Sequence, residues 1–186
     1  VIKAEAPLIK RYGVEVCQKI HQLRPESIVI ADMKTLDTGN LEARMAGDAT
    51  ADVITFSGRA PLKTQERFME ECQKVGALAL MDTINLTDPV KVINQLSIKP
   101  DIVELQGIPD KAQVKEIKKT CEGRVLVAVA GDIGVSEVKE ALASGVDILV
   151  VGEPITGAKD VHGAAMAYLN KMGVYEVDQF RIMTDF

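Results

Sequence analysis

The stretch SIVIADMKTLDTGN, residues 27–40, contains the pattern from which this chain is built. Residues 27–32 form a short, mostly apolar run, and Asp32, Lys34 and Asp37 follow at its end. Apolar residues that do not alternate with polar ones are typical of a parallel strand buried on both faces. A helical segment begins near Gly39. The stretch therefore predicts a buried strand that leads through charged residues into a helix.

The same strand-to-helix pattern repeats along the chain at a spacing of about 25 residues, which indicates βαβ units and a parallel sheet. Gly76, Pro100 and Gly145 mark joints between the units. We expect strands at residues 1–4, 27–32, 52–56, 77–82, 101–105, 124–130 and 147–151. We expect helices at about 8–23, 39–48, 62–75, 88–96, 110–121, 135–144 and 158–172.

Seven βα units fit either an open doubly wound sheet or a (β/α)8 TIM-type barrel whose first strand is missing. No GxGxxG motif follows the first strand, and polar or small residues end many strands, which favours the barrel. These strand-end residues are Asp32, Ser57, Asp82, Gln106, Gly131–Asp132 and Gly152–Glu153. We expect one barrel domain at residues 1–173. We expect residues 174–186 to form a C-terminal tail that packs on the barrel or on a partner.

Composition argues against two classes of partner. The net charge is −5, there is no Trp and 4% of residues are aromatic, whereas nucleic-acid surfaces are usually basic and rich in stacking groups. No apolar run approaches the roughly 20 residues of a membrane span.

The three cysteines are scattered without a CxxC pair, which fits a reducing compartment. We expect a cytoplasmic protein.

The charges at 32–37 allow two kinds of chemistry. In an extended segment Asp32 and Lys34 project to the same side, and Asp37 lies just beyond in the loop. Asp32 is a candidate ligand for a divalent cation. Alternatively, Lys34 donates a proton to an enediolate or carbanion while Asp37 orients it. A salt-bridged strand end without a catalytic role is the third interpretation.

The segment ADMKTLDTGNLEARMA, residues 31–46, resembles the third-strand signature of the orotidine-5′-monophosphate decarboxylase suprafamily. Within it, the chain is most similar to archaeal 3-hexulose-6-phosphate synthases, which are often fused to a formaldehyde-activating domain. The resemblance covers nearly the whole chain. It continues through APLIKRYGVEV, MDTINLTDPV, KPDIVEL, VLVAVAG, VDILVVGEPITGAKDVHGAA and DQFRIMTDF.

The resemblance implies a Mg²⁺-dependent aldolase, a lyase of the ribulose monophosphate pathway of formaldehyde assimilation. Formaldehyde would add reversibly to the enediolate of ribulose 5-phosphate, giving a 3-hexulose 6-phosphate. It implies that Asp32 binds the metal and that Lys34 and Asp37 form the adjoining catalytic pair. Asp37 and Thr38 would reach the neighbouring subunit's site across a homodimer interface. Gly131 and Gly152 would bind the sugar phosphate through backbone N–H groups.

Several positions depart from the family pattern. Lys3 stands where relatives have a metal-binding Glu, and a lysine there repels a cation. Gln106 and Gly107 replace a His-Arg pair, while Asp132 and Glu153 replace the Gly and Arg of the phosphate site. These departures leave open a catalytically impaired relative that acts as a dimeric or regulatory partner. An orotidine-5′-monophosphate decarboxylase-like enzyme is a further alternative, because that reaction uses the same DxKxxD array.

Overall fold

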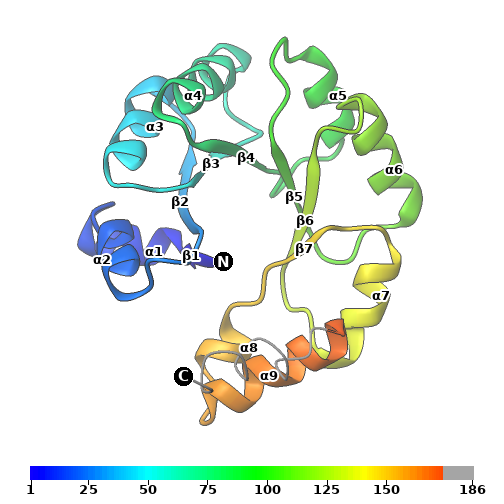
Figure 1. Ribbon diagram of the computed structural model, residues 1–186. Helices are drawn as coiled ribbons and strands as arrows, with labels where there is room; N and C mark the ends of the chain where they lie inside the picture. The colour runs from blue at the N-terminus through cyan, green and yellow to red at the C-terminus, as the bar shows by residue number, and fades with distance from the viewer. Residues whose placement is uncertain (174–186) are drawn as a thin grey trace, which may run out of the picture.

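Seven parallel strands form one sheet in which each strand pairs with the next strand of the chain. The structure is a computed structural model that describes residues 1–173; the predicted tail at 174–186 lies outside the described residues. All seven predicted strands are present, and the predicted barrel-type α/β fold with seven βα units is confirmed. The strands curl around the centre of the molecule and the helices lie outside them (Figure 1).

The strands are β1 (Ile2–Ala4), β2 (Val29–Thr35), β3 (Val53–Ser57), β4 (Leu78–Asp82), β5 (Ile102–Gln106), β6 (Leu126–Ala130) and β7 (Ile148–Leu149). The helices are α1 (Ala6–Tyr12), α2 (Val16–Leu23), α3 (Gly39–Asp48), α4 (Leu62–Val75), α5 (Pro89–Gln95), α6 (Lys111–Thr120), α7 (Val138–Ala143), α8 (Glu153–Thr156) and α9 (Val161–Met172), with a 3₁₀ turn η1 (Val135–Glu137) before α7.

The helices differ most from expectation in two places. The helix expected at 8–23 is two helices, because Gly13 adopts a φ of 82°, a left-handed conformation that ends α1. The helix expected at 135–144 begins as the 3₁₀ turn. The short helix α8 was not expected. Within residues 1–173, no helix has the length and apolar character needed to cross a membrane.

Aspartates fix the amino-terminal ends of the strands. Asp52, Asp101 and Asp147 each precede a strand and accept a hydrogen bond from the backbone N–H of a residue in the neighbouring strand, at 2.7–2.8 Å. Each bond satisfies a donor at the start of a parallel ladder. These three aspartates therefore hold the strands in register and lie at the opposite end from the charged strand tips.

Two apolar clusters stabilise the barrel. The larger lies between the sheet and the outer helices; there Phe56 of β3 packs against Phe68 of α4 with ring centroids 5.1 Å apart. All three cysteines are buried free thiols within it. Burial raises the pKa of Cys17 to about 11 and that of Cys72 to about 12, so both thiols remain protonated and unreactive.

The larger cluster gives a stability prediction. Ile54 is fully buried there, so Ile54→Val should lower the free energy of unfolding by about 0.5–1.5 kcal/mol through loss of one packed methyl group. Ile28→Val is the matched control, because Ile28 is 50% exposed, and we expect a change below about 0.5 kcal/mol. Urea unfolding measures both. Equal losses would mean that the core is wrongly assigned.

Candidate active site

Strand pairing places three carboxylates inside the barrel, near the carboxyl ends of the strands. The smaller apolar cluster forms a layer that comprises Ile30, Val53, Leu80, Ile102 and Ala128. Two residues further along β2, β4 and β5 stand Asp32, Asp82 and Glu104. Because side chains two residues apart on a strand share a face, these carboxylates lie just above the apolar layer. Their residues are 0%, 0% and 1% exposed.

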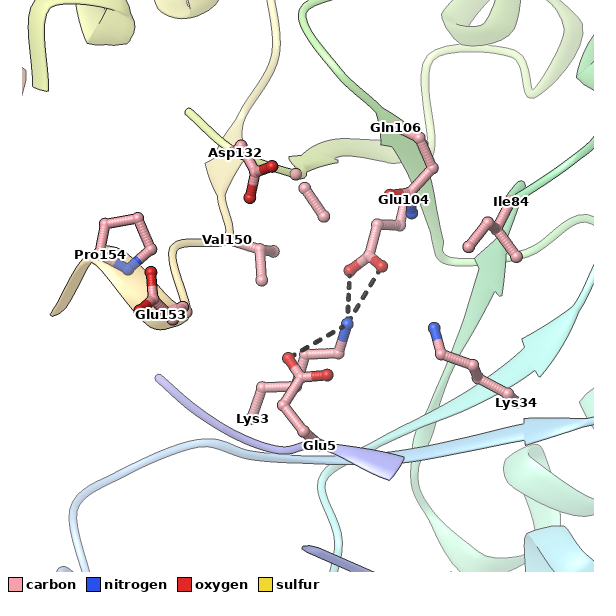
Figure 2. A pocket seen from close by; sticks show the side chains of 13 residues that line it. Lys3, Glu5, Lys34, Ile84, Glu104, Gln106, Asp132, Val150, Glu153 and Pro154 are labelled. Carbon is pink, nitrogen blue, oxygen red and sulfur yellow. Dashed lines mark hydrogen bonds and ion pairs between the residues drawn. The ribbon is translucent and has the colours of Figure 1, made fainter. Parts of the chain in front are cut away.

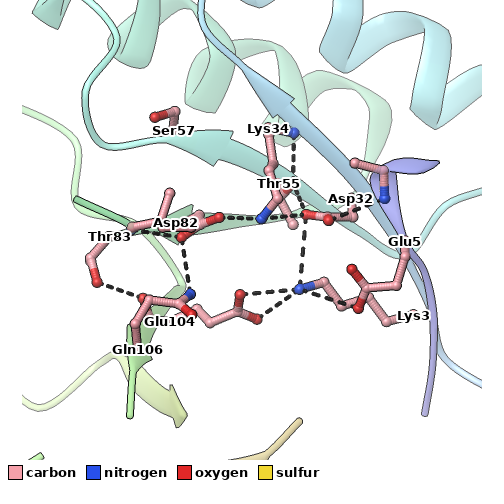
Figure 3. Close-up of polar contacts among 12 residues, drawn as sticks. Lys3, Glu5, Asp32, Lys34, Thr55, Ser57, Asp82, Thr83, Glu104 and Gln106 are labelled. Atoms are coloured by element: carbon pink, nitrogen blue, oxygen red, sulfur yellow. Dashed lines mark hydrogen bonds and ion pairs between the residues drawn. The ribbon is translucent and has the colours of Figure 1, made fainter. Parts of the chain in front are cut away.

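Lys34 joins two of these carboxylates. Its Nζ donates a hydrogen bond to Oδ2 of Asp82 and lies 3.4 Å from Oδ1 of Asp32 (Figure 3). The backbone at Lys34 has a φ of 48°, and its N–H donates to Oγ1 of Thr55 at 3.0 Å. Thr55 in turn donates to Oδ1 of Asp32 at 3.0 Å. The irregular end of β2 therefore directs the ammonium group between two buried carboxylates.

The electrostatic surroundings keep Lys34 protonated. Burial alone would lower the pKa of its amine. The hydrogen bond that Lys34 donates to Asp82 and the negative charges of Asp32, Asp82 and Glu104 outweigh burial and raise the pKa of Lys34 above its ordinary value. At neutral pH the group is a fixed cation that can donate a hydrogen bond.

Lys3 of β1 binds the third carboxylate. Its Nζ donates to both carboxylate oxygens of Glu104, at 3.1 Å each. The same Nζ lies 3.8 Å from Oδ1 of Asp32 and 3.8 Å from Oε1 of Glu5. The Lys3 side chain is 9% exposed. Asp32 therefore lies between two ammonium groups, and the two lysines and four carboxylates form one network (Figure 3).

Two carboxylates of the network have raised pKa values. Burial raises the pKa of Glu104 even though the ammonium of Lys3 lowers it. Burial also raises the pKa of Glu5, and the negative charges of Asp32 and Glu104 add to that effect. A group of coupled carboxylates and lysines at the strand ends of a barrel is typical of an active site.

The Mg²⁺ ion that the resemblance implies does not fit this arrangement. The carboxylate oxygens of Glu104 and Asp32 that would face a metal instead face Nζ of Lys3. Within residues 1–173, no three His, Cys, Asp or Glu side chains are grouped so as to hold a metal ion. No step of the reaction proposed below is therefore assigned to a metal.

The structure brings together some of the predicted site residues and separates others. Asp32 and Lys34 are neighbours, as the spacing predicts. Asp37 and Thr38 are exposed, and Oδ1 of Asp37 accepts a hydrogen bond from the backbone N–H of Thr38 at 2.7 Å. Neither residue lines the pocket beside Lys34. Within this single chain, the expected pairing of Lys34 with Asp37 is replaced by the contact between Lys34 and Asp82.

A cavity of about 230 Å³ lies beside the network (Figure 2). Gly131 and Gly152 both line it, together with the adjoining Asp132 and Glu153. The φ of 125° at Gly131 is a conformation that favours glycine. In Figure 2, Asp132 and Glu153 stand across the cavity from Lys34. The cavity therefore has a lysine–carboxylate side and a second side with two glycines and two further carboxylates.

Sequence reasoning gave too little weight to three members of the network. It named Asp82 only as one of several strand-end residues, named Lys3 only as a replacement, and did not select Glu104. A usable signal was present, because Asp82 and Glu104 each follow an interior apolar residue by two positions. The pairing of Lys3 with Glu104 joins residues 101 positions apart, and local pattern does not reveal such a contact.

The fold and site define a (β/α)-barrel protein with its polar side chains at the carboxyl ends of the strands, where barrel enzymes carry their active sites. The family follows from comparison. Residues 1–168 match the Orotidine 5′-phosphate decarboxylase / HUMPS family, and the chain belongs to that family.

Two curated relatives indicate which members of the family this chain resembles. The chain is 50% identical over 196 aligned residues to the bifunctional enzyme Fae/Hps of Methanocella arvoryzae, and 49% identical over 193 residues to that of Methanosarcina acetivorans. Each alignment covers 100% of this chain but 50% and 49% of the relative. The chain therefore spans about half the length of the curated relatives it matches.

Solved structures agree with these relatives. A crystal structure of 3-hexulose-6-phosphate synthase superposes with a TM-score of 0.76 at 29% identity, covering 91% of this chain and 86% of that one. The 3-hexulose-6-phosphate synthase of Salmonella typhimurium gives 0.79 at 25% identity, covering 94% and 87%. The predicted similarity to 3-hexulose-6-phosphate synthases is confirmed.

Proposed function

We propose that this chain catalyses the reversible addition of formaldehyde to ribulose 5-phosphate, giving 3-hexulose 6-phosphate. It would be a carbon–carbon lyase of the ribulose monophosphate pathway of formaldehyde assimilation. The observation that carries the proposal is the position of Lys34, whose ammonium group lines the cavity while Asp32 and Asp82 hold it. The identity to Fae/Hps enzymes supports the choice of substrates.

The proposed reaction balances without an oxidant. A base removes a proton from C1 of ribulose 5-phosphate, and the electron pair forms an enediolate with its charge on O2. C1 then attacks the formaldehyde carbon and forms the new C–C bond. The former formaldehyde oxygen takes a proton and becomes a hydroxyl group. No atom is lost, and the carbonyl group stays on the former C2.

The positions of Lys34 and Glu5 suggest which proton transfer each residue performs. Lys34 donates the proton to the former formaldehyde oxygen, because its protonated amine faces the cavity. Glu5 accepts the C1 proton: its side chain is 50% exposed and lines the cavity, whereas Glu104 binds Lys3 through both oxygens. The proton on Glu5 then returns to Lys34.

The activity test measures the loss of formaldehyde in the presence of ribulose 5-phosphate. The wild-type chain should consume formaldehyde, and a Lys34→Met variant should not. Orotidine 5′-monophosphate is assayed in parallel, and its decarboxylation would favour the decarboxylase alternative. If the wild type turns over neither substrate faster than the variant, the proposal fails and a non-catalytic role as a dimeric or regulatory partner is favoured.

The second side of the cavity would receive the phosphate group. Backbone N–H groups near Gly131 and Gly152 are available donors there, but the carboxylates of Asp132 and Glu153 repel a dianion. We expect Glu153→Gln to lower KM for ribulose 5-phosphate about tenfold, a change of about 1.4 kcal/mol. Steady-state kinetics measures it. Glu140→Gln, at an exposed position of α7, should leave KM unchanged, and equal effects would contradict the assignment.

A homodimer is part of the proposal. Leu36, Leu41 and Met45 are 58%, 53% and 46% exposed, and Leu41 and Met45 are one helical turn apart on α3. Asp37 and Thr38 lie beside Leu36 in the chain. An apolar patch next to a charged loop supports an interface through which Asp37 and Thr38 enter the neighbouring subunit's cavity.

This interface gives a further prediction. Leu41→Asp places a charge in the patch and should convert a dimer to a monomer in light scattering. Activity should fall with the dimer, because Asp37 no longer reaches the neighbouring site. Leu23→Asp is the matched control, since Leu23 is 79% exposed at the end of α2. A monomeric wild type, or a Leu41→Asp variant with unchanged mass, would refute the interface.

Two further features of the proposal concern the setting of the domain. The fusion named in the curated relatives supports a formaldehyde-activating domain, fused or separate, as the source of formaldehyde. The three buried free thiols support a reducing, cytoplasmic location.

A further inference from the structure

Lys3 occupies the centre of a carboxylate group. Its Nζ binds both oxygens of Glu104 at 3.1 Å and lies 3.8 Å from oxygens of Asp32 and Glu5. These oxygens come from three different strands or strand ends and converge on one ammonium group (Figure 3). The residue also lines the cavity. A cation at this point would therefore contact a substrate bound in the cavity.

A divalent ion on the same oxygens would be close to that ammonium group. Mg²⁺ binds oxygen at about 2.1 Å, and Oδ1 of Asp32 is 3.8 Å from Nζ of Lys3. The ion would then lie within about 6 Å of the ammonium, where a divalent and a monovalent positive charge repel each other strongly. Lys3 and a metal therefore compete for one position.

We propose that Lys3 is a built-in replacement for a divalent cation, so that the site works without a metal. This inference rests on the proposed function and assigns Lys3 as a catalytic residue of that reaction. Its Nζ donates to both oxygens of Glu104 and lines the cavity, where it would also donate to the oxygen on C2 of the ketose phosphate. As C1 loses its proton, negative charge develops on that oxygen, and the ammonium group stabilises it. Lys34 remains free to transfer the proton.

The four carboxylates Glu5, Asp32, Asp82 and Glu104 outnumber the two lysines of the network, so excess negative charge remains to attract a cation. The experiment must therefore measure metal binding as well as turnover. Mn²⁺ is the probe, because the electron paramagnetic resonance signal of free Mn²⁺ reports binding directly. The proteins compared are the wild type, Lys3→Glu, Lys3→Gln and Lys10→Glu, with Lys10 at an exposed position of α1.

We expect turnover of the wild type to change less than twofold when EDTA is added, and we expect no saturable Mn²⁺ binding. Lys3→Gln should lose turnover about 100-fold. Lys3→Glu should bind Mn²⁺, lose turnover in EDTA and recover part of it with Mg²⁺. Lys10→Glu should behave as the wild type. Circular dichroism checks that each variant is folded, and Lys3→Gln serves if Lys3→Glu is not.

Three results would overturn the inference. These are loss of wild-type turnover in EDTA, saturable Mn²⁺ binding by the wild type, and full turnover by Lys3→Gln. If the wild type consumes no formaldehyde with or without Mg²⁺, the proposed function fails and the catalytic role of Lys3 fails with it. The Mn²⁺ titration then still decides whether Lys3 holds the cation position.

Discussion

Replacement of Lys34 by Met should lower kcat for formaldehyde addition by about 1,000-fold, because the variant loses both the proton donor and a fixed positive charge. The side chain lies between Asp32 and Asp82 and faces the cavity. Methionine keeps much of the length and bulk of the lysine stem, so packing around the network is largely retained. Steady-state kinetics under saturating ribulose 5-phosphate measures the loss.

The Lys34→Met variant also needs a stability measurement, because Asp82 is fully buried and would lose its cation. We expect the free energy of unfolding to fall by about 1–3 kcal/mol, which leaves the variant folded under assay conditions if the wild type is ordinarily stable. Lys91→Met on the exposed face of α5 is the control and should change neither quantity. Wild-type kcat in folded Lys34→Met would remove Lys34 from the reaction.

The second large effect concerns Asp82. Asp82→Asn keeps an oxygen for the backbone N–H of Ile84, which donates to Oδ1 at 2.8 Å, but removes the charge that binds Lys34. We expect kcat to fall about 100-fold, equivalent to about 2.7 kcal/mol. The loss should appear mainly in kcat, because Asp82 acts by positioning Lys34 and does not line the cavity.

A pH profile separates positioning from a general loss of structure. The charge of Asp82 helps raise the pKa of Lys34, so Asp82→Asn should move the alkaline limit of kcat to lower pH. Asp88→Asn is the matched control, since Asp88 only caps α5 through Lys91. An unshifted profile together with an unchanged kcat would show that Asp82 does not position Lys34.

Much of the fold could be predicted because parallel strands buried on both faces leave a strong local signal. Continuous apolar runs predicted every strand, and the helix expected at 39–48 is α3 with the same boundaries. The division between α1 and α2 was missed, because the pattern is apolar on both sides of Gly13 and the break depends on one backbone angle. Strand β2 also runs on to Thr35, since its irregular end keeps pairing with β3.

The site could be predicted only where its members are close in sequence. Asp32 and Lys34 are two residues apart, and alternation along a strand places them together. The contacts of Lys34 with Asp82 and of Lys3 with Glu104 depend on how separate strands align. The sequence of a single segment does not reveal that alignment. Asp37 was paired with Lys34 because it lies just beyond the strand, and within this single chain its side chain is exposed.

The most direct test of the proposed reaction is to follow carbon–carbon bond formation by NMR, with formaldehyde and ribulose 5-phosphate both labelled with ¹³C. The wild-type chain should transfer the label to the hydroxymethyl carbon of a 3-hexulose 6-phosphate, and the carbon coupling should identify the new bond. Lys34→Met should leave the label in formaldehyde. Equal label transfer by the two proteins, or none by the wild type in the presence or absence of Mg²⁺, would contradict the account.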